Sequence, residues 1–285
     1  MTLRFSRIPG HGVILHVAEA GREGHPLLVL LHGFPEFWFA WRDWLEPLAA
    51  RGYHVVAPDM RGCNLSDKPA GVFAYDVDLV ARDILSLADH LRADAFALVA
   101  HDWGASVAWR LAGAAPDRLT RMAVFNAPHP AVWRAFVRDD PERKKRGGYV
   151  AALRTSWLPE FAIRLGGFRA LADPFRAPEL AAAFPPQTLA AYFKAWRRPG
   201  ALTAMLNWRR ALLRHEFAMP PSGSLQVPTL MLWGDRDKSG VPALADASAR
   251  LCASAEVVHW PDAGHWTPHE KRDEALAAVT AFLSR

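Results

Sequence analysis

The chain has 285 residues, 51% of them hydrophobic, which is enough for one large core or a core with an inserted subdomain. No run approaches about 18 consecutive apolar residues, so a membrane span is not expected, and nothing resembles a nucleic-acid-binding module. The N-terminal residues lack the apolar stretch of a signal peptide, and Cys63 and Cys252 match no metal or redox spacing. We therefore expect a cytoplasmic protein, either a monomer or a homodimer.

The net charge of +5 is unevenly distributed along the chain. Residues 129–217 contain 16 Lys and Arg against 7 Asp and Glu, a net charge of +9, whereas the remainder contains 18 against 22, a net charge of −4. The densest basic run, Arg143-Lys144-Lys145-Arg146, is of a kind that can attract an anionic partner. Such runs more often form a solvated helix or loop, and this is the interpretation that we favour.

Hydrophobic patterning predicts strands and helices that alternate along most of the chain. Strands are expected at Val13–Ala20, Leu27–Leu31, Tyr53–Pro58, Ala95–Ala100, Met122–Phe125, Thr229–Trp233 and Glu256–His259. Helices are expected near Trp38–Arg51, over 77–92, at Gly104–Ala114 and near Glu270–Leu283. This alternation indicates an α/β fold with a mainly parallel sheet that helices cover on both faces.

The alternation stops between about His129 and Phe217. This stretch is rich in Ala, Leu, Arg and Trp, contains repeated prolines and has few strand-like runs, which is typical of a helical insert. Because it follows the strand end that carries Asn126, it should lie over Asp102 as a lid. The expected domains are an α/β core at 1–128 and 218–285 and a helical cap at 129–217.

Asp102 stands between a strand and a helix, where a nucleophile is expected. The run Leu98–Ser106 matches the nucleophile-elbow pattern G-x-S-x-G, with Asp102 in place of Ser and Ala100 in place of the first Gly. A carboxylate with a pKa of about 4 is already charged at neutral pH and needs no base before it attacks. It attacks saturated carbon and leaves an ester that water can cleave, so an epoxide or a carbon–halogen bond is the expected target. The simpler alternative is that Asp102 only caps the helix.

A second motif, His32-Gly33-Phe34-Pro35, follows the strand at Leu27–Leu31. In this fold pattern the loop supplies one backbone N–H of an oxyanion hole, here that of Phe34, and the residue after the nucleophile, Trp103, supplies the other. Pro35 fixes its own φ, and its peptide bond can be cis. Taken alone, the motif is also compatible with an ordinary turn at the end of a strand.

The base must be chosen among twelve histidines. His265, in Asp262-Ala263-Gly264-His265-Trp266, lies between the last strand and the last helix, which matches the chain order nucleophile, acid, histidine. His259 lies within a strand pattern and is expected to be structural. His101 flanks the nucleophile, and packing is its expected role.

The acid is expected in Trp233-Gly234-Asp235-Arg236-Asp237, directly after a strand. Asp237 lies deeper in the loop and is our choice for orienting His265. Asp235 is expected to cap or brace the turn.

These motifs together resemble the epoxide hydrolases of the α/β-hydrolase fold, and the resemblance covers nearly the whole chain. It rests on His32-Gly33-Phe34-Pro35-Glu36, Asp59-Met60-Arg61-Gly62, Leu65-Ser66-Asp67-Lys68-Pro69, His101-Asp102-Trp103-Gly104, Asn126-Ala127-Pro128-His129-Pro130 and Gly264-His265-Trp266. Some relatives take the acid from the strand after the nucleophile helix. Asn126 stands there in this chain and cannot serve, which leaves Asp237.

Dehalogenases share the Asp nucleophile and are the nearest alternative. Haloalkane dehalogenases usually carry Asn or Glu where this chain has Phe34. Fluoroacetate dehalogenases carry Arg where it has Trp103 and Ser106. A ligand-binding relative without turnover is a third alternative, and the complete set Asp102, His265 and Asp237 speaks against it.

The resemblance also implies two lid tyrosines that hydrogen-bond the epoxide oxygen. Tyr149 lies nine residues before Leu158-Pro159-Glu160, a spacing that matches the first of them. The second normally falls in Asn-Trp-Tyr-Arg, but this chain has Asn207-Trp208-Arg209-Arg210, so Arg209 replaces it. Arg209 either donates to a substrate oxygen or carboxylate or points to solvent while Tyr149 acts alone. We slightly favour the second interpretation, because Arg210 suggests a charged face.

The resemblance implies the following chemistry. Phe34 and Trp103 form an apolar pocket for a small apolar substrate, and Asp102 attacks an epoxide carbon while Tyr149 donates to the ring oxygen. His265 then activates a water that cleaves the ester, the two backbone N–H groups hold the oxyanion, and a diol leaves. No metal or organic cofactor is expected.

Overall fold

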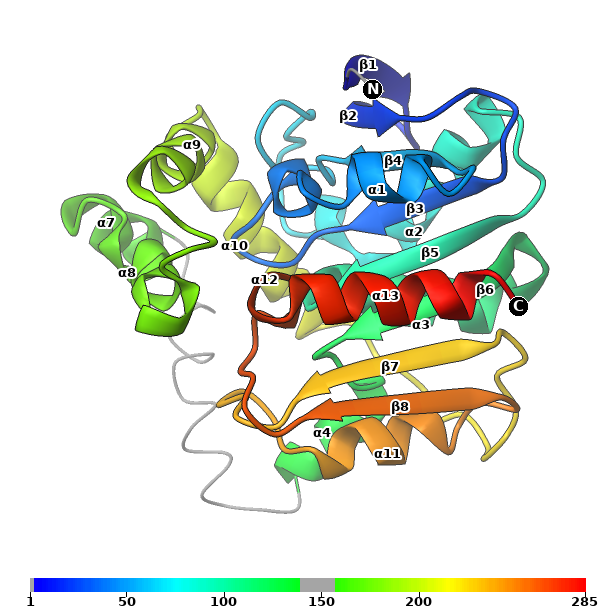
Figure 1. Ribbon diagram of the computed structural model, residues 1–285. Helices are drawn as coiled ribbons and strands as arrows, with labels where there is room; N and C mark the ends of the chain where they lie inside the picture. Colours follow the sequence, from blue (N-terminus) through cyan, green and yellow to red (C-terminus); the bar gives the residue numbers. More distant parts are fainter. Residues whose placement is uncertain (1–2, 139–156) are drawn as a thin grey trace.

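The computed structural model describes residues 3–138 and 157–285. At its centre lies an eight-stranded sheet with the order β1-β2-β4-β3-β5-β6-β7-β8 (Figure 1). β1 (Arg4–Pro9) pairs antiparallel with β2 (Ile14–Ala20), which pairs antiparallel with β4 (His54–Pro58). The remaining strands run parallel to β4, which confirms the predicted mainly parallel sheet: β3 (Leu27–Leu31), β5 (Phe96–His101), β6 (Leu119–Phe125), β7 (Thr229–Gly234) and β8 (Ala255–Trp260).

Helices cover both faces of this sheet, as predicted. β3, β4, β5 and β7 are buried at every position, because apolar residues on both faces of each strand meet a helical layer. One layer contains α2 (Val77–His90), α3 (Trp103–Ala114) and α11 (Ala243–Ala249). The other contains α1 (Leu45–Ala49) and α13 (Arg272–Leu283), and Figure 1 shows α13 lying across that face.

The structure differs from the expected elements in four places. β1 was not predicted, because it is an edge strand whose only fully buried residue is Ile8. The helix expected near Trp38–Arg51 is a 3-10 turn, η1 (Trp38–Trp41), followed by the short α1. The closing helix is divided into α12 (Thr267–Glu270) and α13, because Lys271 between them has a non-helical φ of −122°. The short helix α11 was also missed.

The described residues between β6 and β7 form helices and short 3-10 turns rather than strands. The helices are α4 (Pro130–Arg138), α7 (Leu158–Leu165), α8 (Arg169–Ala172), α9 (Pro186–Trp196) and α10 (Ala201–Leu212), and the 3-10 turns include η4 (Asp173–Arg176) and η5 (Pro178–Leu180). We call residues 157–212 the cap region. Figure 1 shows its helices beyond one end of the sheet, next to α12.

The cap region has an apolar cluster of its own, rich in aromatic rings. Phe175, Tyr192 and Trp196 are almost fully buried in it, and Phe37 and Trp266 from the α/β part complete it. No described helix is long and apolar enough to cross a membrane. Tyr149 and the run Arg143-Lys144-Lys145-Arg146 lie outside the described residues.

Candidate active site

Asp102 lies at the sharp turn between β5 and α3. Its φ of 49° and ψ of −114° are rare for a residue with a side chain, and such strain concentrates at functional sites. Gly104 makes the turn possible, since a Cβ at this position would lie 2.6 Å from the carbonyl oxygen of Leu31. The side chain of Asp102 makes no capping hydrogen bond to α3 and is 21% exposed, which argues against a capping role.

His265 and Asp237 lie next to Asp102, on the loops that follow β8 and β7. His265 Nε2 is 3.6 Å from Asp102 Oδ2, and His265 Nδ1 is 2.7 Å from Asp237 Oδ2. Nδ1–H therefore donates to Asp237, and Nε2 faces Asp102. Asp237 is buried, and its other oxygen accepts from Ser239 N at 2.8 Å and Ser239 Oγ at 2.6 Å. Asn126 Nδ2 donates to Asp237 Oδ2 at 2.9 Å, so Asn126 positions the acid that it cannot itself replace.

Charge interactions set the protonation of these three groups. Burial works to raise the pKa of Asp102 and of Asp237, but in both cases the neighbouring His265 outweighs it and holds the pKa below its usual value. Burial works to lower the pKa of His265, but Asp237 and Asp102 together raise it well above the ordinary value. The charges of Asp237 and Asp102 therefore favour the protonated form of the imidazole. Loss of the charge on Asp102 would lower the pKa of His265.

The loop after β3 closes over the carboxylate of Asp102. Phe34 N–H donates to Asp102 Oδ1 at 2.9 Å. The approach is so close that a Cβ on Gly33 would lie 2.7 Å from the Cβ of Asp102, so this position requires glycine. The Phe34–Pro35 peptide bond is cis. Trp103 is the first residue of α3, so its N–H has no acceptor within the helix and lies at the positive end of the helix dipole.

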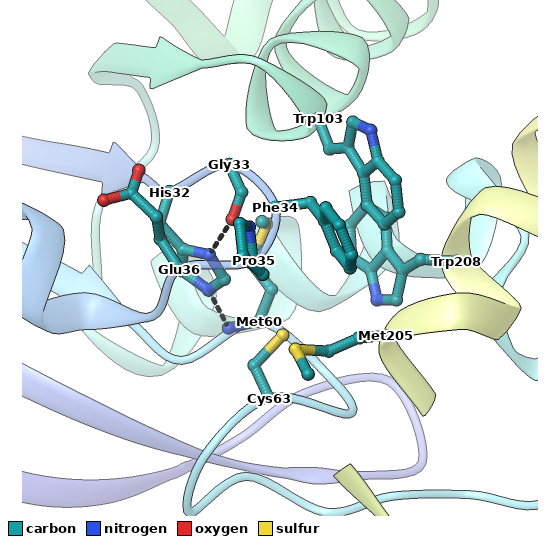
Figure 2. A pocket seen from close by; sticks show the side chains of 10 residues that line it. All are labelled: His32, Gly33, Phe34, Pro35, Glu36, Met60, Cys63, Trp103, Met205 and Trp208. Carbon is teal, nitrogen blue, oxygen red and sulfur yellow. Dashed lines mark hydrogen bonds between the residues drawn. The ribbon is translucent and has the colours of Figure 1, made fainter. Parts of the chain in front are cut away.

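His32 holds this loop as a neutral imidazole. Its Nδ1–H donates to the carbonyl of Gly33 at 2.9 Å, and its Nε2 accepts from Met60 N at 3.1 Å, as Figure 2 shows. Burial lowers the pKa of His32, which agrees with a ring that donates at one nitrogen and accepts at the other.

A small, mainly apolar cavity lies beside these residues and reaches the cap helix α10 (Figure 2). Phe34 stacks on Trp103 with ring centroids 4.5 Å apart, and Trp208 of α10 faces Trp103 at 6.2 Å. Trp208 is anchored because its Nε1–H donates to the carbonyl of Arg61 at 2.8 Å. The cavity is lined by His32, Gly33, Phe34, Pro35, Glu36, Met60, Cys63, Trp103, Met205 and Trp208.

The charged face expected at Arg209 and Arg210 is absent from this part of α10. Arg210 is buried and forms a bidentate ion pair with Glu160 of α7 at 2.7 and 3.0 Å. Arg209 is half-buried, and its guanidinium carbon lies 5.7 Å from the ring centre of Trp103. Arg210 therefore does not support a solvent-facing charged surface at Arg209, because its carboxylate partner lies 50 residues away in the sequence.

Comparison with known proteins agrees with this architecture. A family model described as alpha/beta hydrolase fold matches residues 26–272. This chain belongs to the α/β-hydrolase fold family. It is 40% identical to the AB hydrolase superfamily protein YfhM of Bacillus subtilis over 92% of this chain and 91% of that protein. It is 35% identical to epoxide hydrolase 3 of Mus musculus over 99% of this chain and 78% of that protein.

A solved structure extends the comparison to three dimensions. A mutant of an epoxide hydrolase from Bacillus megaterium superposes on this chain with a TM-score of 0.88 at 28% sequence identity. The match covers 98% of this chain and 100% of that one. The resemblance to the epoxide hydrolases that the motifs indicate is thereby confirmed.

This α/β-hydrolase also contains a buried polar network that the motifs did not predict. Glu36 Oε1 accepts from Tyr192 OH at 2.8 Å and from His269 Nε2 at 2.9 Å. Glu36 Oε2 lies 3.4 Å from His101 Nδ1, and His101 Nε2 donates to the carbonyl of His265 at 3.0 Å. Burial works to raise the pKa of Glu36, but His269 and His101 outweigh it and hold the pKa far below the usual range. His101 therefore connects the charge of Glu36 to the backbone of His265, beyond the packing role expected for it.

Glu270 holds the same loop from the other side. Its carboxylate accepts from Gly264 N at 2.6 Å and from Trp266 N at 2.9 Å, on either side of His265. A carboxylate a few residues after a loop and inside the next helix is a known capping signal that could have identified Glu270. His259 binds Asp235 at 2.7 Å, which gives both residues a structural contact.

Among residues 3–138 and 157–285, one group of metal-ligand side chains lies outside this site, formed by Asp76, Asp78 and His215. Arg110 pairs with Asp78, and Asp76 caps α2 by accepting from the backbone N of Asp78. His215 Nδ1 lies 3.2 Å from Asp76. These contacts account for the cluster as ion pairing and helix capping.

Proposed function

We propose that this α/β-hydrolase converts epoxides into vicinal diols through a covalent ester on Asp102. The observation that carries the proposal is the position of this carboxylate, which accepts from Phe34 N–H with one oxygen and faces His265 with the other. The names of two relatives, epoxide hydrolase 3 of Mus musculus and the epoxide hydrolase of Bacillus megaterium, support the substrate class.

In the first step, a carboxylate oxygen of Asp102 attacks one epoxide carbon from the side opposite the breaking C–O bond. The bond pair passes to the ring oxygen, which takes a proton, and we assign this donation to Tyr149. No base is required, because the low pKa of Asp102 keeps the nucleophile ionised. We propose the division 1–128, 129–217 and 218–285 for core, cap and core, in which the cap brings Tyr149 to the substrate.

In the second step, water attacks the carbonyl carbon of the ester while His265 takes its proton. The N–H groups of Phe34 and Trp103 stabilise the resulting oxyanion. The oxyanion collapses, the acyl C–O bond breaks, and the departing alkoxide takes the proton from His265 to complete the diol. Asp102 returns to its carboxylate and Tyr149 regains its proton, so one water is consumed for each epoxide.

The first step prepares His265 for the second. Esterification makes Asp102 neutral, which removes one of the two negative charges that raise the pKa of His265. The pKa of the imidazole then falls, and a neutral ring becomes available as the base. Asp237 remains charged and keeps the ring oriented through Nδ1.

A substrate panel tests the reaction class. The protein is incubated with aryl and alkyl epoxides, haloalkanes and fluoroacetate, and diol and halide are measured. We expect diol from epoxides. Halide release without diol would assign the chain to the dehalogenases, and binding without any product would assign it to the ligand-binding relatives.

Isotope labelling tests the ester mechanism. Over repeated turnovers in H₂¹⁸O, water attacks the carboxyl carbon, so the peptide that contains Asp102 should gain ¹⁸O. A His265→Gln control should gain none, because its ester is not hydrolysed. A fully active protein without label in this peptide would contradict the covalent route.

A further inference from the structure

The outer side of the cap region carries an apolar stripe that the described residues leave exposed. Trp157, Phe161 and Leu165 are 71%, 57% and 77% exposed, and Leu158 is 50% exposed. At about 100° per residue, Leu158, Phe161 and Leu165 lie on one face of α7, and Trp157 immediately precedes the helix. We call these four residues the apolar stripe. Contiguous exposed apolar surface of this kind usually marks an interaction site.

The opposite side of α7 is fixed to the rest of the cap region. Glu160 is buried and bound to Arg210, and Ile163 packs against the cluster that includes Phe168. These contacts hold the helix with its apolar stripe outward. Figure 1 shows α7 and α8 at the end of the cap farthest from the sheet.

A basic groove lies near the C-terminal end of α7. Its lining includes Gly167, which lies two residues after Leu165, and five basic side chains: Arg169, Arg176, Lys194, Arg197 and Arg198. Arg176 pairs with Asp173, whereas no acidic residue in the described part of the chain pairs with Arg169 or Lys194. The groove therefore presents positive charge that its own surroundings do not neutralise.

We propose that the apolar stripe and the basic groove together form a docking surface for an anionic lipid bilayer. Large apolar side chains insert at the headgroup level, tryptophan favours this interface, and Lys and Arg attract anionic headgroups. A second copy in a two-fold contact would instead bring the same unneutralised cations face to face. The cap region, residues 157–212, contains eight Lys and Arg against three Asp and Glu, and this net charge of +5 favours its approach to such a surface.

Docking on a bilayer places the cap region next to the hydrocarbon interior, in which apolar molecules dissolve. The docking surface contains none of the residues assigned to catalysis, so this inference stands apart from the proposed function. It can be tested without any epoxide.

Co-sedimentation with vesicles tests the inference on the full chain. One set of vesicles contains phosphatidylcholine alone, and the other contains phosphatidylcholine and phosphatidylglycerol in equal parts. We expect binding to the anionic vesicles that weakens as salt is added, and much weaker binding to the neutral ones. Equal binding to both sets would overturn the proposal.

Two double variants separate the contributions. Arg169→Gln/Lys194→Gln should weaken binding about 25-fold, since each basic residue near an anionic surface contributes about fivefold. Phe161→Ser/Leu165→Ser should weaken it at least about tenfold through lost apolar insertion.

Matched controls lie outside the docking surface. Arg51→Gln/Arg250→Gln removes the same charge from exposed positions of the α/β part, and Phe73→Ser removes a side chain that is 77% exposed, like Leu165. Both controls should bind as wild type does, and the melting temperature of each variant checks its fold. Equal binding by all folded variants would overturn the proposal. So would a dimer that forms without vesicles and is lost in Phe161→Ser/Leu165→Ser, because the occupant would then be a second copy.

Discussion

The α/β core and the cap region present their functional side chains in opposite ways. In the core, Asp102, His265 and Asp237 follow β5, β8 and β7 at one edge of the sheet, and hydrogen bonds fix each of them. In the cap, Trp208 and Arg209 face the site from one helix, while the apolar stripe on α7 faces outward. Fixed geometry is what ester hydrolysis requires, so we assign that step to the core. We assign substrate access and epoxide opening to the cap.

The largest effect should come from a change in the core alone. His265→Gln should still be alkylated, because Asp102 needs no base, but ester hydrolysis should fall by about 10²–10⁴-fold or more. Intact-mass spectrometry with an epoxide should then show the protein plus one substrate mass. His259→Gln changes a histidine that binds Asp235 and should keep turnover. A folded His265→Gln protein that stays unmodified would mean that the base or the substrate class is misassigned.

A change in the cap, Tyr149→Phe, should slow the first half-reaction, in which the epoxide alkylates Asp102. An epoxide oxygen becomes an alkoxide as the ring opens, and acid assistance is worth about 10²–10⁴-fold. Tyr149→Phe should therefore slow alkylation severely, because Arg209 stands where a second tyrosine is expected. Arg209→Tyr should speed alkylation of neutral epoxides, since Arg209 lies against Trp103.

Single-turnover mass spectrometry measures both half-reactions in these variants. Ester hydrolysis should be unchanged in Tyr149→Phe. Tyr53→Phe is the control, because its hydroxyl binds the carbonyl of Leu283, away from the site. Full epoxide activity in Tyr149→Phe would remove the tyrosine assignment.

The two half-reactions should also separate with pH. The pKa of Asp102 lies below its ordinary value, so the nucleophile stays ionised and alkylation persists as the pH falls toward about 4. Hydrolysis requires neutral His265 and should fall about tenfold for each pH unit below the pKa that His265 has in the ester. The alkylated fraction at steady state should therefore rise as the pH is lowered from about 8 to about 5. A constant fraction across this range would argue against His265 as the base.

The sequence predicts the core far better than the cap. The strands at Leu27–Leu31 and Thr229–Trp233 are continuous apolar runs, and the loops that follow them carry motif residues, so local pattern suffices. The cap helices are short and depend on contacts remote in sequence, such as the pair Arg210–Glu160. The network around Glu36 could not be predicted for the same reason. No local pattern joins Glu36 to Tyr192, which is 156 residues away.

The smallest effect should come from loss of the hydrogen bond between Tyr192 of the cap and Glu36 of the core. Tyr192→Phe removes the donation to Glu36 but keeps the ring in its aromatic cluster, and His269 still binds the same oxygen. We expect the free energy of unfolding to fall by about 1–3 kcal/mol. A looser cap should raise KM up to about fivefold, the equivalent of about 1 kcal/mol, without slowing ester hydrolysis.

Tyr75→Phe is the control that separates the loss of stability from the rise in KM. Its buried hydroxyl donates to the carbonyl of Pro69 at 2.7 Å, within the α/β part, so its loss should reduce stability similarly but leave KM unchanged. Chemical denaturation and steady-state kinetics on both variants make the comparison. If Tyr192→Phe instead slowed hydrolysis at constant KM, the effect would have passed through Glu36 and His101 to His265. Cap and core would then share the hydrolytic step, and the assignment of that step to the core alone would fail.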